Sequence, residues 1–214
     1  MDRAKSVVEC YVTCNKLKDV VRTGWKDWKV QRDRLESVAE HIYGVQMLAI
    51  IVNSQYQCNI DLEKVVLMLA IHELEEIYIG DLTLFQISKE EKEKLGHEAV
   101  SKLLSGWKDK EKIESLILEF DERKTKEAKF AFFCDKLECD LQSKLYDEEG
   151  CVDLNNQQGN KTYHDDKVQK LLQQEKSWSG MWLQFGQERY NYDEVFLEIS
   201  NYAKNNKIKK LVKD

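Results

Sequence analysis

The chain has 214 residues, of which 42% are hydrophobic and 34% are charged, and its formal net charge is −6. This composition indicates a globular protein rather than a disordered one, and the length fits a single domain over residues 1–214. A net acidic chain lacks the basic face that duplex nucleic acid requires, so we expect no such partner.

The six cysteines form no Cys-x-x-Cys pair, which argues against a zinc ribbon. Residues 1–20 are mixed and charged, so we expect no secretory signal, and no apolar run is long enough to span a bilayer. We therefore expect a cytoplasmic protein with free thiols and no membrane partner. Proline is absent and only nine glycines occur, which favours helices over β-structure.

Apolar residues at helical spacing predict a series of helices joined by polar loops. The predicted helices span residues 3–21, 36–54, 62–79, 88–104, 110–121, 125–146, 165–178, 180–189 and 191–208. Residues 62–79 are nearly all apolar in their middle, so we expect this helix to be the central one. The polar stretch 147–164 is the best loop candidate and could cover a site. The sequence thus predicts an all-α fold.

Three places put a histidine or an acid inside an apolar helical pattern: His41, the pair His72–Glu73, and Asp135. Singly, each has an ordinary explanation, since buried histidines are usually hydrogen-bonded and an aspartate can pair with a nearby lysine. Together, two imidazoles and two carboxylates can surround a divalent metal such as Mn, Fe, Co, Ni or Zn. The positive charge of a metal would also offset the negative charge of the acidic segment "HELEEIYIGDL" at 72–82.

The short sequence segments around these residues resemble those of the HD superfamily of metal-dependent phosphohydrolases. They are "ESVAEH" at 36–41, "HELEE" at 72–76, "GDL" at 80–82 and "CDKLECDLQSK" at 134–144. "RTGW" at 22–25 is similar to the branch of bacterial 5′-deoxynucleotidases and their eukaryotic relatives. The resemblance covers about residues 15–146, whereas the helices predicted over 165–208 are generic. It implies a single-domain HD-type helical bundle and a homodimer.

The resemblance also implies a role for each matched residue. The metal ligands would be His41, His72, Glu73 and Asp135, the catalytic acids Glu76 and Asp81, and the substrate contacts Arg22 near the phosphate and Trp25 near the sugar. Arg32 or Arg34 could share the phosphate role. The spacing of two of these residues agrees with the implied roles. His72 and Glu76 are four residues apart and would lie on one face of a helix.

One position departs from the family's pattern. The family is named for a His-Asp pair, and this chain has His72–Glu73. Glutamate is an ordinary metal ligand with a longer reach, so metal binding is expected to survive. Glu75 is expected to face solvent or a lysine, and His97 to be partly exposed or near the substrate. Trp178 and Trp182, one turn apart, are expected to pack internally or at a subunit contact.

The function that follows is metal-dependent hydrolysis of a small-molecule nucleotide, the 5′-monophosphate of a (deoxy)nucleoside, by a metal-activated water. Two alternatives stay open at this point. The chain could hydrolyse another phosphoester, such as a cyclic nucleotide or a nucleoside triphosphate. The His-Glu pair could instead mark a catalytically weak relative that binds nucleotides.

Overall fold

The structure is a computed structural model that describes residues 2–83 and 86–211. Within these ranges every regular element is helical, and one isolated antiparallel bridge joins Val21 to Ser37. The all-α prediction is confirmed. None of the described helices is long and apolar enough to cross a membrane.

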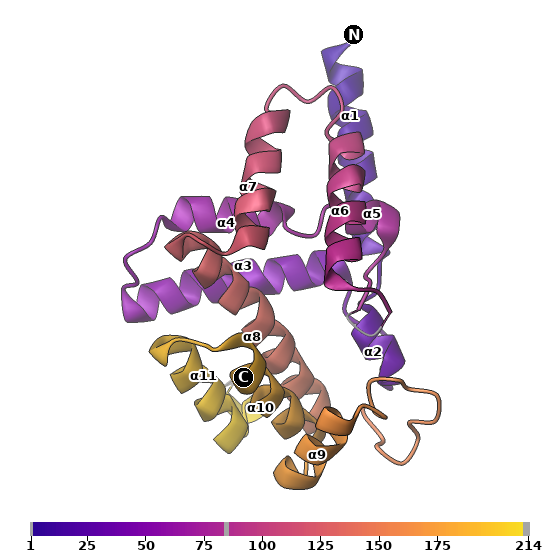
Figure 1. The fold of residues 1–214 in the computed structure, drawn as a ribbon, viewed down its shortest axis with the longest axis vertical. Coiled ribbons are helices and arrows are strands. Elements are labelled where there is room, and N and C mark those ends of the chain that lie inside the picture. The colour runs from indigo at the N-terminus through magenta and orange to yellow at the C-terminus, as the bar shows by residue number, and fades with distance from the viewer. Residues whose placement is uncertain (1, 84–85, 212–214) are drawn as a thin grey trace.

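The helices in chain order are α1 (Arg3–Cys14), the 3₁₀ turn η1 (Asn15–Lys18), α2 (Thr23–Asp27), α3 (Val38–Tyr56), α4 (Leu62–Ile71), α5 (Glu76–Ile79), α6 (Lys89–Leu103), α7 (Lys110–Glu122), α8 (Lys126–Glu148), α9 (Asp166–Glu175), α10 (Trp178–Tyr190), α11 (Glu194–Asn205) and η2 (Lys209–Leu211). Figure 1 shows α8 running from the layer of α3 and α4 down to α9 and α10, with α6 and α7 above. Helix α8 therefore links the two halves of the molecule.

The helix predicted over 62–79 is interrupted in the structure. Helix α4 ends at Ile71, and the backbone N–H groups of Leu74 and Glu76 donate to carbonyls three residues earlier, at 3.2 and 3.1 Å. These tight turns have three residues per turn, so the expected stripe from His72 to Glu76 does not exist. Four of the five residues at 72–76 are ionisable, and polar partners hold the side chains of His72, Glu73 and Glu76.

Two further predictions differ at the N-terminal end. The first helix was expected over 3–21, but α1 ends at Cys14 and a 3₁₀ turn follows. "RTGW" was expected to break the chain into a loop, and it instead begins the short helix α2. None of the residues of α1 is buried, and contact with the core begins where the helix ends, at the partly buried Cys14 and the buried Leu17 of the 3₁₀ turn.

The core consists of two clusters of buried side chains. The larger lies among α3, α4, α7 and α8, and includes Val45, Met68 and Leu137. The smaller joins α2 to α9 and α10 through Trp25, Trp28 and Trp178. The predicted internal packing of Trp178 is confirmed, because its ring lies 5.6 Å from Trp28 and 6.1 Å from Trp25, centroid to centroid. The metal ligands predicted from the sequence lie on α3 and α8 and directly after α4, the helices that carry this larger cluster.

The stretch between α8 and α9 is a loop, as predicted, and it is tied to the smaller cluster. Gln157 is buried and donates from Nε2 to the carbonyl of Trp28 at 3.0 Å. Asn160 donates in turn to Gln157 Oε1 at 2.8 Å. These bonds hold the loop beside α2, where Thr162 lines the cavity described below.

Candidate metal centre and active site

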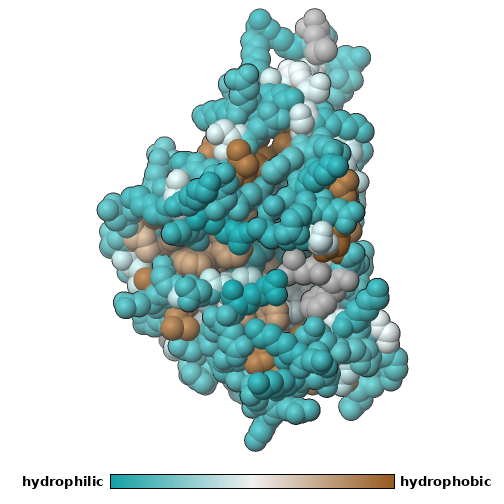
Figure 2. Space-filling model, in the orientation of Figure 1, coloured by the Kyte–Doolittle hydropathy of each residue, from teal (hydrophilic) through white to brown (hydrophobic). Residues whose placement is uncertain are grey.

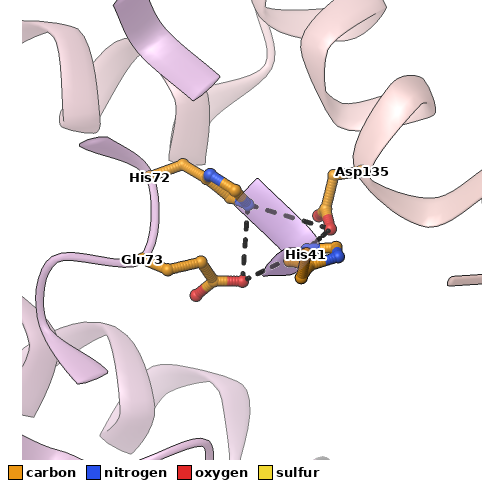
Figure 3. A group of neighbouring side chains, drawn as sticks. All are labelled: His41, His72, Glu73 and Asp135. Carbon is orange, nitrogen blue, oxygen red and sulfur yellow. Dashed lines mark hydrogen bonds and ion pairs between the residues drawn. The ribbon is translucent and has the colours of Figure 1, made fainter. Parts of the chain in front are cut away.

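Four side chains from three parts of the chain converge in the interior. His41 comes from α3, His72 and Glu73 from the turns after α4, and Asp135 from α8. One ligand atom of each lies within 4.8 Å of the others, and all four residues are buried. Figure 3 shows the four side chains pointing toward a common point. The structure thus brings together the complete ligand set that the sequence predicted.

A second carboxylate orients His41 toward this point. Nδ1 of His41 lies 2.6 Å from Glu138 Oε2, and Nε2 lies 3.2 Å from Asp135 Oδ1. A carboxylate behind a histidine holds the ring and its tautomer, as in many metal sites. The brace needs Gly44, because a Cβ at that position would collide with Glu138 Oε1. Glu138 was not predicted, although its spacing of three from Asp135 puts both on one face of α8.

His72 presents an acceptor that has no donor. Its Nδ1 lies 2.8 Å from the carbonyl of Leu69 and therefore carries the proton. Nε2 is buried without a hydrogen-bond partner among the described residues, and it faces Glu73 Oε1 at 3.4 Å and Asp135 Oδ1 at 3.9 Å. Burial lowers the pKa of His72, which favours the neutral form of the ring. A neutral imidazole nitrogen facing two carboxylates is the donor set of a divalent cation.

The two carboxylates of the cluster are ionised. Burial raises the pKa of Glu73, but His72, Lys92 and Arg22 outweigh it and bring that pKa to about 2. Burial also raises the pKa of Asp135, and Lys136 at 2.7 Å with His41 lowers it well below its usual range. Two carboxylates and two imidazoles fit Mn, Fe, Co, Ni or Zn equally in chemistry. The residues present therefore fit the metal that the sequence predicted.

The longer acid at position 73 reaches the cluster. Its Oε1 lies 4.0 Å from His41 Nε2 and 3.7 Å from Arg22 Nη1. Glutamate in place of aspartate therefore keeps a carboxylate oxygen beside both histidines. It also puts that oxygen in contact with the guanidinium of Arg22, which joins the metal cluster to the wall of the cavity.

Glu76 opens α5 and is almost fully buried, with 1% of its surface exposed. Oε1 accepts from Lys92 Nζ at 3.2 Å, while Oε2 has no hydrogen-bond partner among the described residues. Burial, Glu73 and Asp81 raise the pKa of Glu76 well above its usual value. Lys92 was not predicted, because it lies in the charged run "KEEKEK" that otherwise forms a solvated helix face.

The prediction for Glu75 is wrong. Its side chain is half-buried rather than solvated, and Oε2 is buried without a partner among the described residues. Gly96 of α6 lies against it, since a Cβ there would be 3.3 Å from Glu75 Cγ. Burial and the charge of Glu73 raise the pKa of Glu75 to about 8. Helix α6 covers this side chain, which the sequence pattern of residues 72–76 did not reveal.

Asp81 turns back toward the site and holds the start of α2. Its Oδ2 accepts from the backbone N–H of Thr23 at 2.6 Å, and its Oδ1 lies 4.0 Å from Arg22 Nη1. Arg22 also donates from Nη2 to Cys139 Sγ at 2.9 Å. The Arg22 guanidinium is therefore held between α8, Glu73 and Asp81, with 13% of its side chain exposed.

Arg22, Cys139 and Asp81 line a cavity of about 530 Å³, whereas His41, Glu76 and Glu138 are not among its lining residues. Of the predicted site residues, the lining contains Arg22, Trp25, His72, Glu73, Asp81 and Asp135. Trp25 is also a core residue, and its Nε1 donates to Glu36 Oε2 at 2.7 Å. His97 is partly exposed at the rim, 2.8 Å from Asp121 Oδ2, as expected. Figure 2 shows a mostly hydrophilic face on which apolar side chains show near the middle.

Arg34 lies elsewhere. Its side chain is 78% exposed and pairs with Glu40, and it is not among the residues that line the cavity. Arg32 pairs with Glu149 at 3.5 Å and is also outside the lining. The loop that carries both arginines runs over the surface, so of the three candidate arginines only Arg22 faces the metal cluster.

The family model described as HD domain matches residues 14–178 of this chain. The chain belongs to the HD domain family. It is 34% identical to the 5′-deoxynucleotidase HDDC2 of Dictyostelium discoideum, over 66% of this chain and 78% of that protein. It is 31% identical to the 5′-deoxynucleotidase hdd1 of Schizosaccharomyces pombe, over 69% of this chain and 76% of that protein.

Solved structures agree on the HD-type fold. The PH0347 protein of Pyrococcus horikoshii OT3 matches with a TM-score of 0.66 and 24% identity, over 92% of this chain and 98% of that one. A predicted metal-dependent phosphohydrolase of Magnetospirillum magnetotacticum MS-1 matches with a TM-score of 0.59 and 20% identity, over 94% of each chain. At these identities the two structures support the fold alone.

Proposed function

We propose that the protein is a metal-dependent phosphohydrolase that removes the 5′-phosphate of nucleoside monophosphates, with deoxynucleotides favoured. The observation that carries the proposal is His72 Nε2, a buried acceptor without a donor that faces the carboxylates of Glu73 and Asp135. The relatives named 5′-deoxynucleotidases support the substrate class. A cavity of about 530 Å³ beside the cluster has the size of a small-molecule site.

His41, His72, Glu73 and Asp135 would hold the divalent ion, whose identity among Mn, Co, Fe, Ni and Zn is open. When bound, such an ion lowers the pKa of a water and polarises a phosphoryl oxygen. Glu138 acts through His41, since it holds the imidazole with Nε2 toward the cluster. The chain's own residues then divide the remaining tasks of phosphate hydrolysis.

Glu76 is proposed as the general base. Lys92 holds one carboxylate oxygen at 3.2 Å, and the other oxygen is free to accept a proton from water. Lys92 also balances the charge of this carboxylate next to Glu73. Removing Glu76 should therefore slow hydrolysis and leave metal binding in place, because Glu76 is outside the ligand set.

Arg22 is proposed to bind the substrate phosphate, with Trp25 beside the sugar. The guanidinium lines the cavity and lies 3.7 Å from Glu73, so a phosphate beside the metal cluster is within its reach. Asp81 is proposed to position Arg22 and the start of α2, and to assist the leaving oxygen of the sugar. A phosphate held in this way has its charge neutralised on two sides.

The test is phosphate release from a panel of nucleotides by metal-loaded protein. We expect inorganic phosphate and a nucleoside from the 5′-monophosphates. Asp135→Ala should remove the metal and the activity, and Glu76→Ala should cut activity by about 10²–10⁴-fold with metal retained. Glu111→Ala, an exposed acid on α7 outside the cavity lining, is the matched control.

The products discriminate among the functions that the sequence left open. A monophosphate released from a cyclic nucleotide, or triphosphate released from a nucleoside triphosphate, would identify another phosphoester as the substrate. Thermal stabilisation by nucleotides without any turnover would identify a binding protein. Unchanged phosphate release in both Asp135→Ala and Glu76→Ala would refute the proposed site. Elemental analysis of purified protein identifies the metal.

We further propose a homodimer in a reducing, cytoplasmic environment. All six cysteines are free, which supports a reducing compartment. Helix α1 has no buried residue, and Val7 and Tyr11 on it are 68% and 65% exposed, while Tyr43 on α3 is 67% exposed. Apolar helix faces of this kind support a subunit contact. Light scattering should give twice the chain mass, and a charge in place of Tyr43 should halve it.

A further inference from the structure

Helix α6 contributes a lysine with unused donors to the wall of the cavity. Lys92 lines the cavity, and 27% of its side chain is exposed. An ammonium group has three N–H donors, and among the described residues Nζ of Lys92 has one partner, Glu76 Oε1 at 3.2 Å. The other two donors of this largely buried cation are therefore available to a ligand in the cavity.

A glycine on the same helix face brings Lys92 to this position. Lys92 and Gly96 are four residues apart and share one face of α6. Gly96 is buried, and a Cβ there would lie 3.3 Å from Glu75 Cγ. The absence of a side chain at Gly96 lets α6 approach the turns after α4 closely enough for Lys92 to reach Glu76.

Lys92 also lies near a metal ligand. Burial raises the pKa of Glu73, and His72, Lys92 and Arg22 lower it, with a larger effect from Lys92 than from Arg22. Nη1 of Arg22 is 3.7 Å from Glu73 Oε1. The charge of Lys92 therefore acts on Glu73 at least as strongly as a guanidinium at that distance, which indicates that the ammonium lies beside the metal cluster.

A different lysine near the cluster, Lys136, is placed less favourably for a ligand of the metal. Its Nζ contacts Asp135 Oδ2 at 2.7 Å, whereas Oδ1 is the oxygen that faces His41 and His72. Nζ of Lys136 also lies over the Phe132 ring, 5.4 Å from the ring centroid. Lys136 therefore pairs with the oxygen of Asp135 that the histidines do not contact, and Lys92 is the better candidate for a substrate contact.

We propose that Lys92 donates to the phosphate of the substrate and that, together with Arg22 and the metal site, it selects a terminal phosphate over a phosphodiester. This inference rests on the proposed function, which takes a phosphate to lie at the metal cluster. A terminal phosphate has three non-bridging oxygens, one for each of the three contacts, whereas a phosphodiester has two. A phosphodiester therefore leaves one of the three contacts without a charged oxygen.

The first test measures the affinity of the metal-loaded protein for inorganic phosphate by calorimetry. Lys92→Met keeps an unbranched side chain and removes its donors, so we expect the dissociation constant to rise about 10–100-fold, the effect of one charged hydrogen bond. Lys92→Arg should recover part of the loss. Lys94→Met, at an exposed position of α6 outside the cavity lining, is the matched control. An unchanged dissociation constant in Lys92→Met would overturn the inference.

The second test separates a direct contact from an effect through Glu76. Phosphate affinity is measured for Glu76→Ala and for the double variant with Lys92→Met, because residue 76 transmits no effect of Lys92 once its carboxylate is removed. We expect Lys92→Met to weaken phosphate binding by about the same factor in both backgrounds. Loss of the Lys92 effect in the Glu76→Ala background would mean that Lys92 only positions Glu76, and it would overturn the inference.

The third test changes the ligand and leaves Lys92 in place. A deoxynucleoside 5′-monophosphate and the methyl ester of its phosphate are titrated into metal-loaded Glu76→Ala, in which turnover is expected to be slow. We expect the monophosphate to bind at least about tenfold more tightly, and this difference should shrink in the double variant with Lys92→Met. Equal affinities with Lys92 present would overturn the inference even if Lys92→Met fails to fold.

The phosphate measurements also separate this inference from the proposed function. Phosphate binding that requires Lys92, in a protein that hydrolyses no nucleotide, supports the terminal-phosphate site, and only the proposed function fails. Hydrolysis of nucleoside monophosphates, with phosphate affinity unchanged in Lys92→Met, leaves the proposed function standing and removes the role of Lys92.

Discussion

Two aspartates on the same helix show how differently the two ends of the cavity are built. Asp135 and Asp140 are five residues apart on α8, and both are buried, with 2% and 5% of their surfaces exposed. Lys136 lies 2.7 Å from Asp135 and His41 lies 3.2 Å away, whereas Tyr192 is the single hydrogen-bond partner of the Asp140 side chain among the described residues.

The pKa values of the two groups move in opposite directions. Burial raises both, but Lys136 and His41 bring the pKa of Asp135 well below its usual range. For Asp140 the Tyr192 hydrogen bond does not offset burial, and the pKa stays well above its usual range. Burial alone therefore does not determine the direction in which the pKa of a buried aspartate moves in this fold. The charged and hydrogen-bonding groups next to each carboxylate determine that direction.

The two ends also come from different parts of the chain. The Asp135 end is built by α3, the turns after α4 and α8, all within the residues that the HD domain model matches. The Asp140 end is completed by α10 and the link to α11, beyond the matched residues 14–178 except for the first residue of α10. The residues that the family model matches thus supply the metal cluster, and the C-terminal helices complete the opposite wall.

Gly186→Ala should have the largest effect and acts on the Asp140 end. A Cβ at Gly186 would collide with Asp140 Oδ2 and lie 3.2 Å from its Cγ. We expect the free energy of unfolding to fall by about 1–3 kcal/mol from overpacking between α8 and α10. Thermal or urea unfolding measures it. Gly24→Ala is the control, because a Cβ there meets nothing within 4 Å. Equal effects of the two variants would show that α8 and α10 pack more loosely than described.

Glu138→Gln acts on the Asp135 end. The change keeps the shape of the side chain and removes the charge behind His41 Nδ1. We expect metal affinity to fall about 10–100-fold, or about 1.4–2.7 kcal/mol. Competition with a metal chelator measures it. Glu111→Gln on the surface of α7 should leave the affinity unchanged. Wild-type affinity in Glu138→Gln would mean that His41 needs no brace.

Asp140 should give stability a pH dependence that Asp140→Asn removes. The pKa of Asp140 is raised in the folded state, where Tyr192, Lys136, Asp135 and Glu138 are its titratable neighbours. The folded protein then binds more protons than the unfolded one above the unfolded pKa of about 3.9, so this contribution is lost as pH rises. The stability difference, wild type minus variant, should fall by at most about 1.4 kcal/mol per pH unit. A difference that grows with pH would contradict this.

Glu73→Asp should have the smallest effect. The shorter acid restores the family's His-Asp pair and keeps a carboxylate next to His72. It also draws the carboxylate back from Arg22 Nη1, now 3.7 Å away. We expect metal affinity to change by less than about tenfold, because the ligand type is unchanged. A substrate KM that rises more than metal affinity changes would show that the Glu73–Arg22 contact organises the phosphate site. Complete loss of metal would contradict this expectation.

Most of the fold and the metal cluster could be predicted from the sequence. Helical periodicity predicts α3, α6, α7, α8 and the C-terminal helices closely, because each has an apolar stripe against the core. His41, His72, Glu73 and Asp135 stand out because they interrupt such stripes. The turns at 72–75 could not be predicted, since apolar residues at helical spacing continue through them to Ile79.

The opposite wall could not be predicted for a different reason. Asp140 looks like a surface residue in "LECDLQSK", and its burial depends on Gly186 and Tyr192, about 50 residues later. The same holds for Lys92, which becomes a partner of Glu76 only when α6 folds over α5. Arg34 shows the opposite outcome. It lies next to a sequence motif of the site, but its loop places its side chain at the surface. Such contacts depend on tertiary packing and leave no local pattern.

Gly44 has a consequence for the interpretation of other sequences of the HD domain family. Only a residue without a Cβ leaves room for Glu138, and Glu138 is what holds His41 in place. The spacing His-x-x-Gly on one helix and Asp-x-x-Glu on another should therefore be inherited as a pair. A chain that has lost one half of this two-part signature should have lost the other, and a chain with both halves should orient its first histidine in the same way.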